Sequence, residues 1–198
     1  MRVKSHWFKT GRVRAPSEIA GALAFVIWRI GDNALKNTRK AKFEVAVGKQ
    51  YFSFLSEFLI FLIQVADRIA YRQLSAQDRM VFTSTLANRV AETLAENQSR
   101  LMGNSFAEHK QRFIDKLNQR AGEYADFNYD NEGPEFAFTR YLGFCIREVM
   151  DEIDAAWVID QMMSIEAPEA VTMVEKAMRE LFETEPKQPS SRKTVSGD

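Results

Sequence analysis

The apolar residues between Tyr51 and Ala70, in the stretch YFSFLSEFLIFLIQVADRIA, form the strongest hydrophobic pattern in the chain. They recur at three-and-four spacing, which indicates a helix. Further apolar side chains cover most of the remaining circumference, so we expect other helices to surround this one. The pattern therefore predicts a central helix over about residues 43–71. It leaves open whether residues 43–50 are a loop or the first turns of that helix.

The same stretch is long enough to raise the alternative of a membrane span, which needs about 20 apolar residues. Glu57 and Gln64 interrupt the run, and Asp67 closes it. A charged side chain at mid-span costs a few kcal/mol on insertion scales. We therefore predict a buried helix of a globular core and no membrane span.

Apolar residues at helical spacing also occur on both sides of the central helix. Two stretches, Ser75 to Asp78 and Ser105 to Glu108, have a hydroxyl followed three residues later by a carboxylate, the pattern of a helix N-terminus. The remaining helices are expected from about Pro16 to Lys36, with a possible bend at Gly31, from Pro134 to about Met163, with Ile153 and Trp157 inward, and from Pro168. The predicted fold is an all-α, single-domain bundle of about six helices.

Charge divides the chain into a predicted arm, body and tail. Residues 1–50 carry 11 basic and 3 acidic side chains, whereas residues 151–198 carry 5 basic and 11 acidic ones. We predict a basic N-terminal arm at 1–15, the helical bundle at 16–183 and a flexible polar tail at 184–198. The asymmetry is compatible with an anionic partner, with attraction between the ends of one chain, or with self-association.

The predicted arm is a candidate anion-binding segment because its cations alternate with aromatic residues and no acid accompanies them. Those cations are Arg2, Lys4, Lys9, Arg12 and Arg14. Weak nucleic-acid binding at most is expected. The alternatives are a terminus that pairs with acids of the body and a targeting segment.

A narrow polar seam on the central helix is the candidate ligand pocket. Ser53, Glu57 and Gln64 lie along it, and Arg29 is the expected cationic partner of Glu57. A few polar groups in an apolar cavity are typical of a ligand site. The alternative is a helix edge that reaches water, since acids are rarely fully buried.

The densest group of acids is the candidate metal site. If residues 148–154 were helical, Glu148 would lie one turn from Asp151 and from Glu152, so their oxygens could share a divalent cation. The alternative is a solvated face, in which Arg147 pairs with Asp151.

The sequence has no nucleophile elbow, no phosphate-binding glycine loop and no zinc-ligand spacing, so no cofactor is expected. The single cysteine, Cys145, permits no internal disulfide and suggests a reducing, cytoplasmic location. We therefore expect a non-enzymatic binding, adaptor or regulatory protein that forms a homo-oligomer or binds a protein partner. The alternatives are a divalent-metal enzyme that uses the acids Glu148 to Asp154, and a protein that binds a small apolar ligand in its Phe-rich core. The pattern does not identify the partner or ligand.

Overall fold

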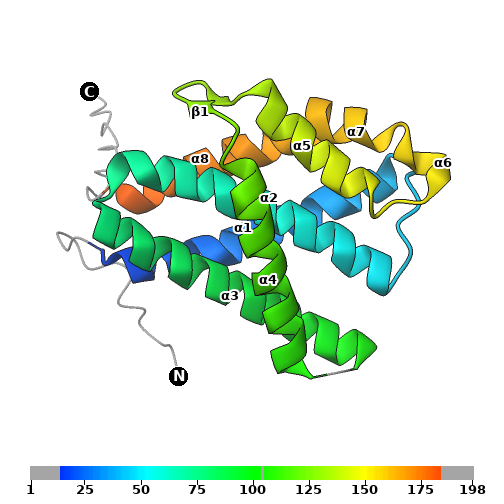
Figure 1. The fold of residues 1–198 in the computed structure, drawn as a ribbon, viewed down its shortest axis with the longest axis horizontal. Helices are drawn as coiled ribbons and strands as arrows, with labels where there is room; N and C mark the ends of the chain where they lie inside the picture. The colour runs from blue at the N-terminus through cyan, green and yellow to red at the C-terminus, as the bar shows by residue number, and fades with distance from the viewer. Residues whose placement is uncertain (1–13, 104, 184–198) are drawn as a thin grey trace, which may run out of the picture.

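The computed structural model describes residues 14–103 and 105–183, and nearly all of them are helical (Figure 1). Two short strands, β1 and β2, pair in an antiparallel hairpin. The prediction of an all-α bundle is confirmed. The elements in chain order are α1 (Pro16–Lys40), α2 (Lys49–Gln73), α3 (Ala76–Met102), α4 (Phe106–Tyr124), β1 (Tyr129–Asp130), β2 (Gly133–Pro134), α5 (Phe136–Arg147), α6 (Glu152–Ala155), α7 (Val158–Gln161), the π-helix η2 (Met162–Glu166) and α8 (Ala167–Phe182).

Helix α2 is the centre of the structure. Every side chain from Phe54 to Ala66 is buried, and α1, α3, α4, α5 and α8 all pack against this helix. Helices α1, α2, α3 and α8 run along the long axis of the molecule, whereas α4 crosses α2 and α3 steeply (Figure 1). Helix α2 begins at Lys49. It follows a loop in which Lys42 and Gly48 have positive φ angles, so residues 43–48 are not the first turns of α2.

Helix α1 continues through Gly31, so the chain is not interrupted there. A Cβ atom at this position would lie 3.0 Å from Cδ2 of Leu59 and 3.1 Å from Cδ1 of Leu55. The glycine therefore lets α1 approach α2 closely, and close packing rather than chain flexibility explains its presence in the helix.

The two expected helix starts differ in their capping. Ser75 caps α3, since its Oγ accepts a hydrogen bond of 3.1 Å from the backbone N–H of Asp78. Ser105 precedes α4 at the expected position, but its side chain makes no capping hydrogen bond. The sequence pattern therefore located both helices and identified one working cap.

The predicted long helix from Pro134 to Met163 is wrong. The chain breaks into α5, α6, α7 and η2 over this range, and Ile153 and Trp157, expected to face inward, are 87% and 68% exposed. Acids that follow the C-terminus of α5 oppose the helix dipole there, whereas Asp151, in an extended conformation, occupies the N-cap position of α6. The local electrostatics thus outweighed the apolar spacing.

None of the helices within the described ranges is both long and apolar enough to cross a membrane.

Candidate functional site

Glu57 lies in the core of the molecule and is ion-paired with two cations of α4. Its side chain is 2% exposed. Arg120 donates from Nε to Oε2 at 3.1 Å and from Nη2 to Oε1 at 3.0 Å, and Lys116 donates to Oε1 at 3.0 Å. The expected partner, Arg29, is instead exposed and lies over the ring of Phe25. Glu57 is therefore neither a solvated helix edge nor a partner of Arg29.

The same guanidinium connects α2 with α5 through further polar groups. Nη1 of Arg120 donates to Glu123 at 3.0 Å and to the hydroxyl of Tyr141 at 2.8 Å, and Tyr141 in turn donates to Glu123. Burial by itself lowers the pKa of Arg120, but the bonds to Glu57 outweigh this effect and raise it. Because the Glu57 carboxylate and the Arg120 guanidinium are both paired, this network holds three helices together and offers no obvious anchor for a ligand.

The predicted polar seam does not form the floor of one pocket. Ser53 lines a small cavity beside the first turns of α2, whereas Gln64 lines a separate cleft further along the helix. Glu57 lies between them in sequence and lines neither. The structure thus places these three residues in three different environments.

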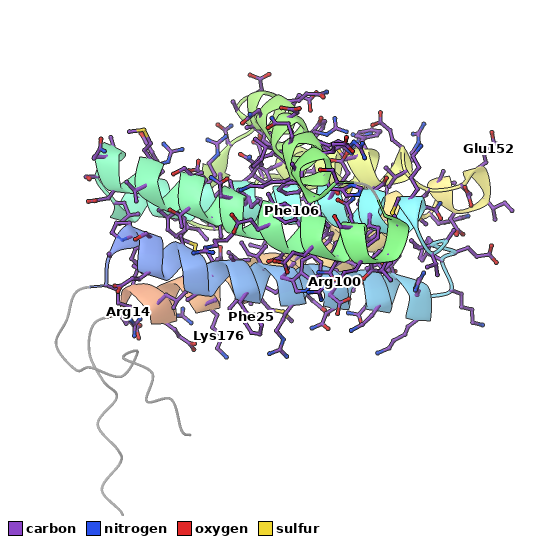
Figure 2. The ribbon with its side chains drawn as sticks, turned by 90° about the horizontal axis from the view of Figure 1, so that it is seen from below. Arg14, Phe25, Arg100, Phe106, Glu152 and Lys176 are labelled. Atoms are coloured by element: carbon purple, nitrogen blue, oxygen red, sulfur yellow. The ribbon has the colours of Figure 1, made fainter. Side chains whose placement is uncertain are left out.

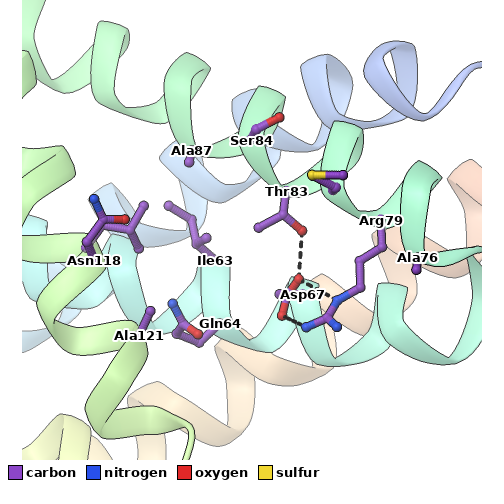
Figure 3. Close-up of a pocket in the computed structure, with 12 residues that line it drawn as sticks. Ile63, Gln64, Asp67, Ala76, Arg79, Thr83, Ser84, Ala87, Asn118 and Ala121 are labelled. Carbon is purple, nitrogen blue, oxygen red and sulfur yellow. Dashed lines mark hydrogen bonds and ion pairs between the residues drawn. The ribbon is translucent and has the colours of Figure 1, made fainter.

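The cleft between α2, α3 and α4, here called the α2–α3–α4 cleft, is the candidate functional site (Figure 3). Its volume is about 440 Å³. The inner wall is apolar, with Ile63, Ala87 and Leu117 all buried. The complete lining is Ile63, Gln64, Asp67, Ala76, Arg79, Met80, Thr83, Ser84, Ala87, Leu117, Asn118 and Ala121.

Gln64 is the most informative residue of this cleft. This residue belongs to the most apolar helix, and 9% of its surface is exposed. Its amide makes no hydrogen bond to any residue that the structure describes. The amide nitrogen and oxygen are not among the buried unpartnered atoms of the described residues, so they are accessible from the cleft. The cleft therefore contains a polar group that a bound molecule could satisfy.

One side of the cleft carries a closed polar cluster. Asp67 accepts hydrogen bonds from Nε of Arg79 at 2.9 Å and from the hydroxyl of Thr83 at 2.7 Å (Figure 3). The hydrogen bond to Asp67 raises the pKa of Arg79, so this cation stays charged. Because the two charges neutralise each other, the wall has no net charge to attract an ion.

The candidate metal residues do not share a helix face, because α5 ends at Arg147 and α6 begins only at Glu152. Glu148 lies 3.4 Å from Arg120, and Glu152 projects from one end of the molecule (Figure 2). No group of three or more His, Cys, Asp or Glu side chains within residues 14–103 and 105–183 is placed to hold an ion. The arrangement of Glu148, Asp151 and Glu152 gives no support to a metal-dependent enzyme.

Of the five cations in the predicted basic arm, only Arg14 belongs to the described part of the chain. Its Nη1 donates to the backbone carbonyl oxygens of Leu181, at 2.7 Å, and Glu180, at the end of α8. A cation near the C-terminus of a helix is favourable because of the helix dipole. Arg2, Lys4, Lys9 and Arg12 lie outside the described residues, as do the other residues of 1–13 and the tail at 184–198.

Sequence reasoning found Gln64 but missed the residues that complete its cleft. Asp67, Arg79 and Thr83 carry ordinary surface-type polarity, and no local pattern shows that they meet. Asn118 is an exposed residue at the rim. The only available signal was an amide on an otherwise apolar helix.

Comparison with known proteins gives no relative. No protein-family model matches this chain, and neither a curated protein nor a solved structure shows significant similarity to it. The functional conclusions therefore depend on the geometry of the chain itself.

Proposed function

We propose that this chain is a non-enzymatic binding protein and that its ligand lies in the α2–α3–α4 cleft. The observation that supports this proposal is the amide of Gln64, which bonds to no described residue and is open to a cleft of about 440 Å³ in an otherwise apolar part of α2. Small-molecule sites are typically concave, mostly apolar and supplied with a few oriented polar groups. The volume of the α2–α3–α4 cleft also falls within the usual range of about 300–1,000 Å³ for such sites.

The cleft favours a neutral and largely apolar ligand. Asp67 and Arg79 satisfy each other, so an ionic group would find no free counter-charge there. Gln64 offers an amide carbonyl and an amide NH₂ side by side, which complement a donor and an acceptor on one edge of the ligand. A lactam, whose cis amide has its N–H and C=O on one edge, or a primary amide on an apolar body has this chemistry.

Native mass spectrometry of the purified full chain tests whether such a ligand co-purifies. We expect an added mass that is lost when the protein unfolds. Gln64→Leu should remove the added mass, because leucine fills the same wall without hydrogen-bonding groups. Gln73→Leu is the matched control, since Gln73 is an exposed residue of the same helix.

A fragment screen by thermal shift covers the case in which the ligand dissociates during purification. Amide-containing apolar fragments should raise the melting temperature of the native chain and of Gln73→Leu, because ligands that bind only the folded state stabilise it. They should not stabilise Gln64→Leu. Equal stabilisation of all three proteins, or of none of them by any fragment, would contradict the proposal.

A second candidate function is contact with a protein partner or a second copy through the segment from α6 to the start of α7. Ile153 in α6 exposes 87% of its surface, and Trp157, the residue before α7, exposes 68%. Exposed tryptophan is enriched among residues that dominate protein interfaces. Light scattering after size exclusion should show an oligomer that Trp157→Ser dissociates, and a native chain that is monomeric at micromolar concentrations would exclude self-association. We also propose a reducing, cytoplasmic location, since Cys145 is a buried free thiol.

A further inference from the structure

The outer face of α5, a helix at the outside of the bundle, carries a stripe in which phenylalanines and arginines alternate (Figure 1). Phe136, Arg140, Phe144 and Arg147 recur at intervals of four, four and three residues, so they share one side of the helix. Phe136 is 67% exposed and Phe144 38%, and both arginines are exposed. Apolar groups that gather on one exposed face are typical of a contact surface. These four residues are here called the α5 stripe.

The rings of the α5 stripe hold its guanidinium groups in place. Cζ of Arg140 lies 5.9 Å from the ring centre of Phe136 and 5.2 Å from that of Phe144. Cζ of Arg147 lies 6.0 Å from the ring centre of Phe144. Cation–π contacts of this length are attractive. An arginine that is already held in this way loses less conformational entropy when it binds a partner.

The positive charge of the α5 stripe is not compensated by acids nearby. Residues 136–147 contain no acid. The acids on either side are engaged, because Glu135 accepts from the backbone N–H of Asn128 at 2.8 Å and Glu148 lies 3.4 Å from Arg120. Neither arginine of the stripe pairs with an acid of the described ranges. Two held cations therefore remain free to bind an acceptor.

The two ends of the stripe differ in charge. Glu132 and Glu175 line a cavity together with Phe136, but neither Arg140 nor Arg147 lines this cavity. The uncompensated cations thus lie towards the C-terminal end of α5. A partner that complements the stripe must place its own acids over that end.

We propose that the α5 stripe binds an acidic amphipathic helix of a partner protein. A carboxylate is the planar acceptor that matches the fork of a guanidinium. Arg140 and Arg147 are seven residues apart, which corresponds to about 10.5 Å along the helix axis. A helix that lies alongside α5 reaches both arginines with two carboxylates that are also seven residues apart. Its apolar residues between these carboxylates contact Phe144, as in other cases in which an amphipathic helix docks on an apolar surface.

The arrangement of the rings favours such a helix over the other polyanions that arginine binds. Bases of a single-stranded nucleic acid stack on open ring faces, whereas two guanidinium groups lie over the ring of Phe144. A helix that lies on a membrane inserts an apolar face and keeps its cations on the polar face. In the α5 stripe the cations lie between the rings, on the same face.

Fluorescence anisotropy of the full chain with three labelled helical peptides of equal length tests the proposal. The first peptide has two glutamates seven residues apart with leucines between them on the same face. The second has the glutamates four residues apart, and the third has glutamines in place of the glutamates. We expect the native chain to bind the first peptide about ten-fold more tightly than either of the others. Equal affinity for all three peptides, or binding of none, would overturn the proposal.

Variants show whether the peptide occupies the α5 stripe. Arg140→Gln combined with Arg147→Gln should weaken binding of the first peptide about ten-fold or more. Arg100→Gln combined with Arg179→Gln removes the same charge from exposed positions on α3 and α8 and should bind like the native chain. The same loss in both double variants would contradict the site.

Two further variants separate this site from the other exposed surface of the chain. Phe136→Ser, at an exposed position, should weaken the first peptide several-fold, because it removes a ring that holds Arg140. Trp157→Ser should bind this peptide like the native chain, so a failure of contact through the segment from α6 to the start of α7 is distinguishable from a failure here. Loss of peptide binding in Trp157→Ser would contradict the proposed position.

A thymidine oligonucleotide and phosphatidylserine vesicles test the class of partner. The native chain should bind both more weakly than the first peptide. Tighter binding of either one, with loss of that binding in the double variant at Arg140 and Arg147, would overturn the assignment to an acidic helix.

Discussion

Arg120 of α4 donates two parallel hydrogen bonds to the two carboxylate oxygens of Glu57 on α2, at 3.1 and 3.0 Å. This fork geometry is the strongest arrangement of an arginine–carboxylate pair. Glu57 is 2% exposed at its side chain and Arg120 13%, so water screens the pair little. The pair connects α2, the most buried helix, to α4, which crosses it. Each charge of the pair is compensated by the other in a place that water hardly reaches.

Removal of the arginine should destabilise the fold strongly. Arg120→Gln leaves Glu57 in the core with only Lys116 as a cationic partner, and breaking a buried pair typically costs about 3–5 kcal/mol. Urea unfolding followed by circular dichroism measures this loss. Arg100→Gln, an exposed position on α3, is the control and should stay within about 0.5 kcal/mol of the native chain.

A double variant separates the net value of the pair from the cost of a stranded charge. Glu57→Leu combined with Arg120→Leu removes both charges, so it should lose less stability than Arg120→Gln alone. A double variant that is the less stable of the two would show that the pair itself, rather than the stranded charge, accounts for the loss.

The two serines before α3 and α4 should differ in their contribution to stability. Ser75→Ala removes a capping hydrogen bond and should lower the free energy of unfolding by about 1 kcal/mol. Ser105→Ala removes no such bond and should change it by less than about 0.5 kcal/mol. Thermal and urea unfolding of both variants under identical conditions provides the comparison. A loss below about 0.5 kcal/mol for Ser75→Ala as well would show that the cap at Ser75 is not formed in solution.

Cys145 should be unreactive in the folded protein. Only 2% of the surface of Cys145 is exposed. Burial, together with the nearby charge of Glu57, raises the pKa of the thiol to about 12. At pH 8 roughly one thiol in ten thousand is then the reactive thiolate. Iodoacetamide should modify Cys145 only as fast as the chain unfolds.

An introduced surface thiol in the same molecule serves as the control for this labelling. Ser164 is exposed, so the new thiol of Ser164→Cys should react at the rate of a free peptide. Mass spectrometry of the digested protein reads both sites at once. Labelling of Cys145 at a comparable rate would contradict its burial.

Glu166 should make the fold less stable as the pH rises. Burial raises the pKa of this carboxyl above its ordinary value of 4.5, although the amides of Gln161 and Asn37 oppose the shift. The folded state therefore binds this proton more tightly than the unfolded state does. Its contribution is fully present below about pH 4.5 and is lost as the pH rises through the folded pKa.

Glu166→Gln removes that loss, because glutamine stays neutral and its carbonyl still accepts from Gln161. The variant should be more stable than the native chain at pH 7, and the difference should shrink towards pH 4. Urea unfolding over this range measures it. Glu44→Gln, at an exposed loop position, is the control and should show no such trend.

The periodicity of apolar residues was sufficient to predict the central helix and the presence of a polar seam on it. It could not identify the partners of Glu57, because Lys116 and Arg120 are 59 and 63 residues away. A helical pattern shows which face of a helix is polar, but not which element covers that face. The choice of Arg29 failed for this reason.

The region after Arg147 shows the opposite limitation. Apolar spacing continues through Ile153 and Trp157, so periodicity alone predicts one helix, whereas α5 ends before Glu148 and α6 starts after Asp151. The amide of Gln64 could be recognised as unusual on an apolar helix. Its cleft could not, because Arg79 and Asn118 reach it from two other helices.

The π-helical turn at Met162–Glu166 affects how the fold responds to the deletion of a single residue. Each hydrogen bond in such a turn spans one residue more than in an α-helix. Deletion of one residue within 162–166 would let the turn become α-helical and leave the buried residues of α8 facing the core. The same deletion inside α8 would rotate everything beyond it by about 100° and turn Met178 away from its neighbours. The chain thus tolerates a one-codon deletion at this turn better than one turn further on.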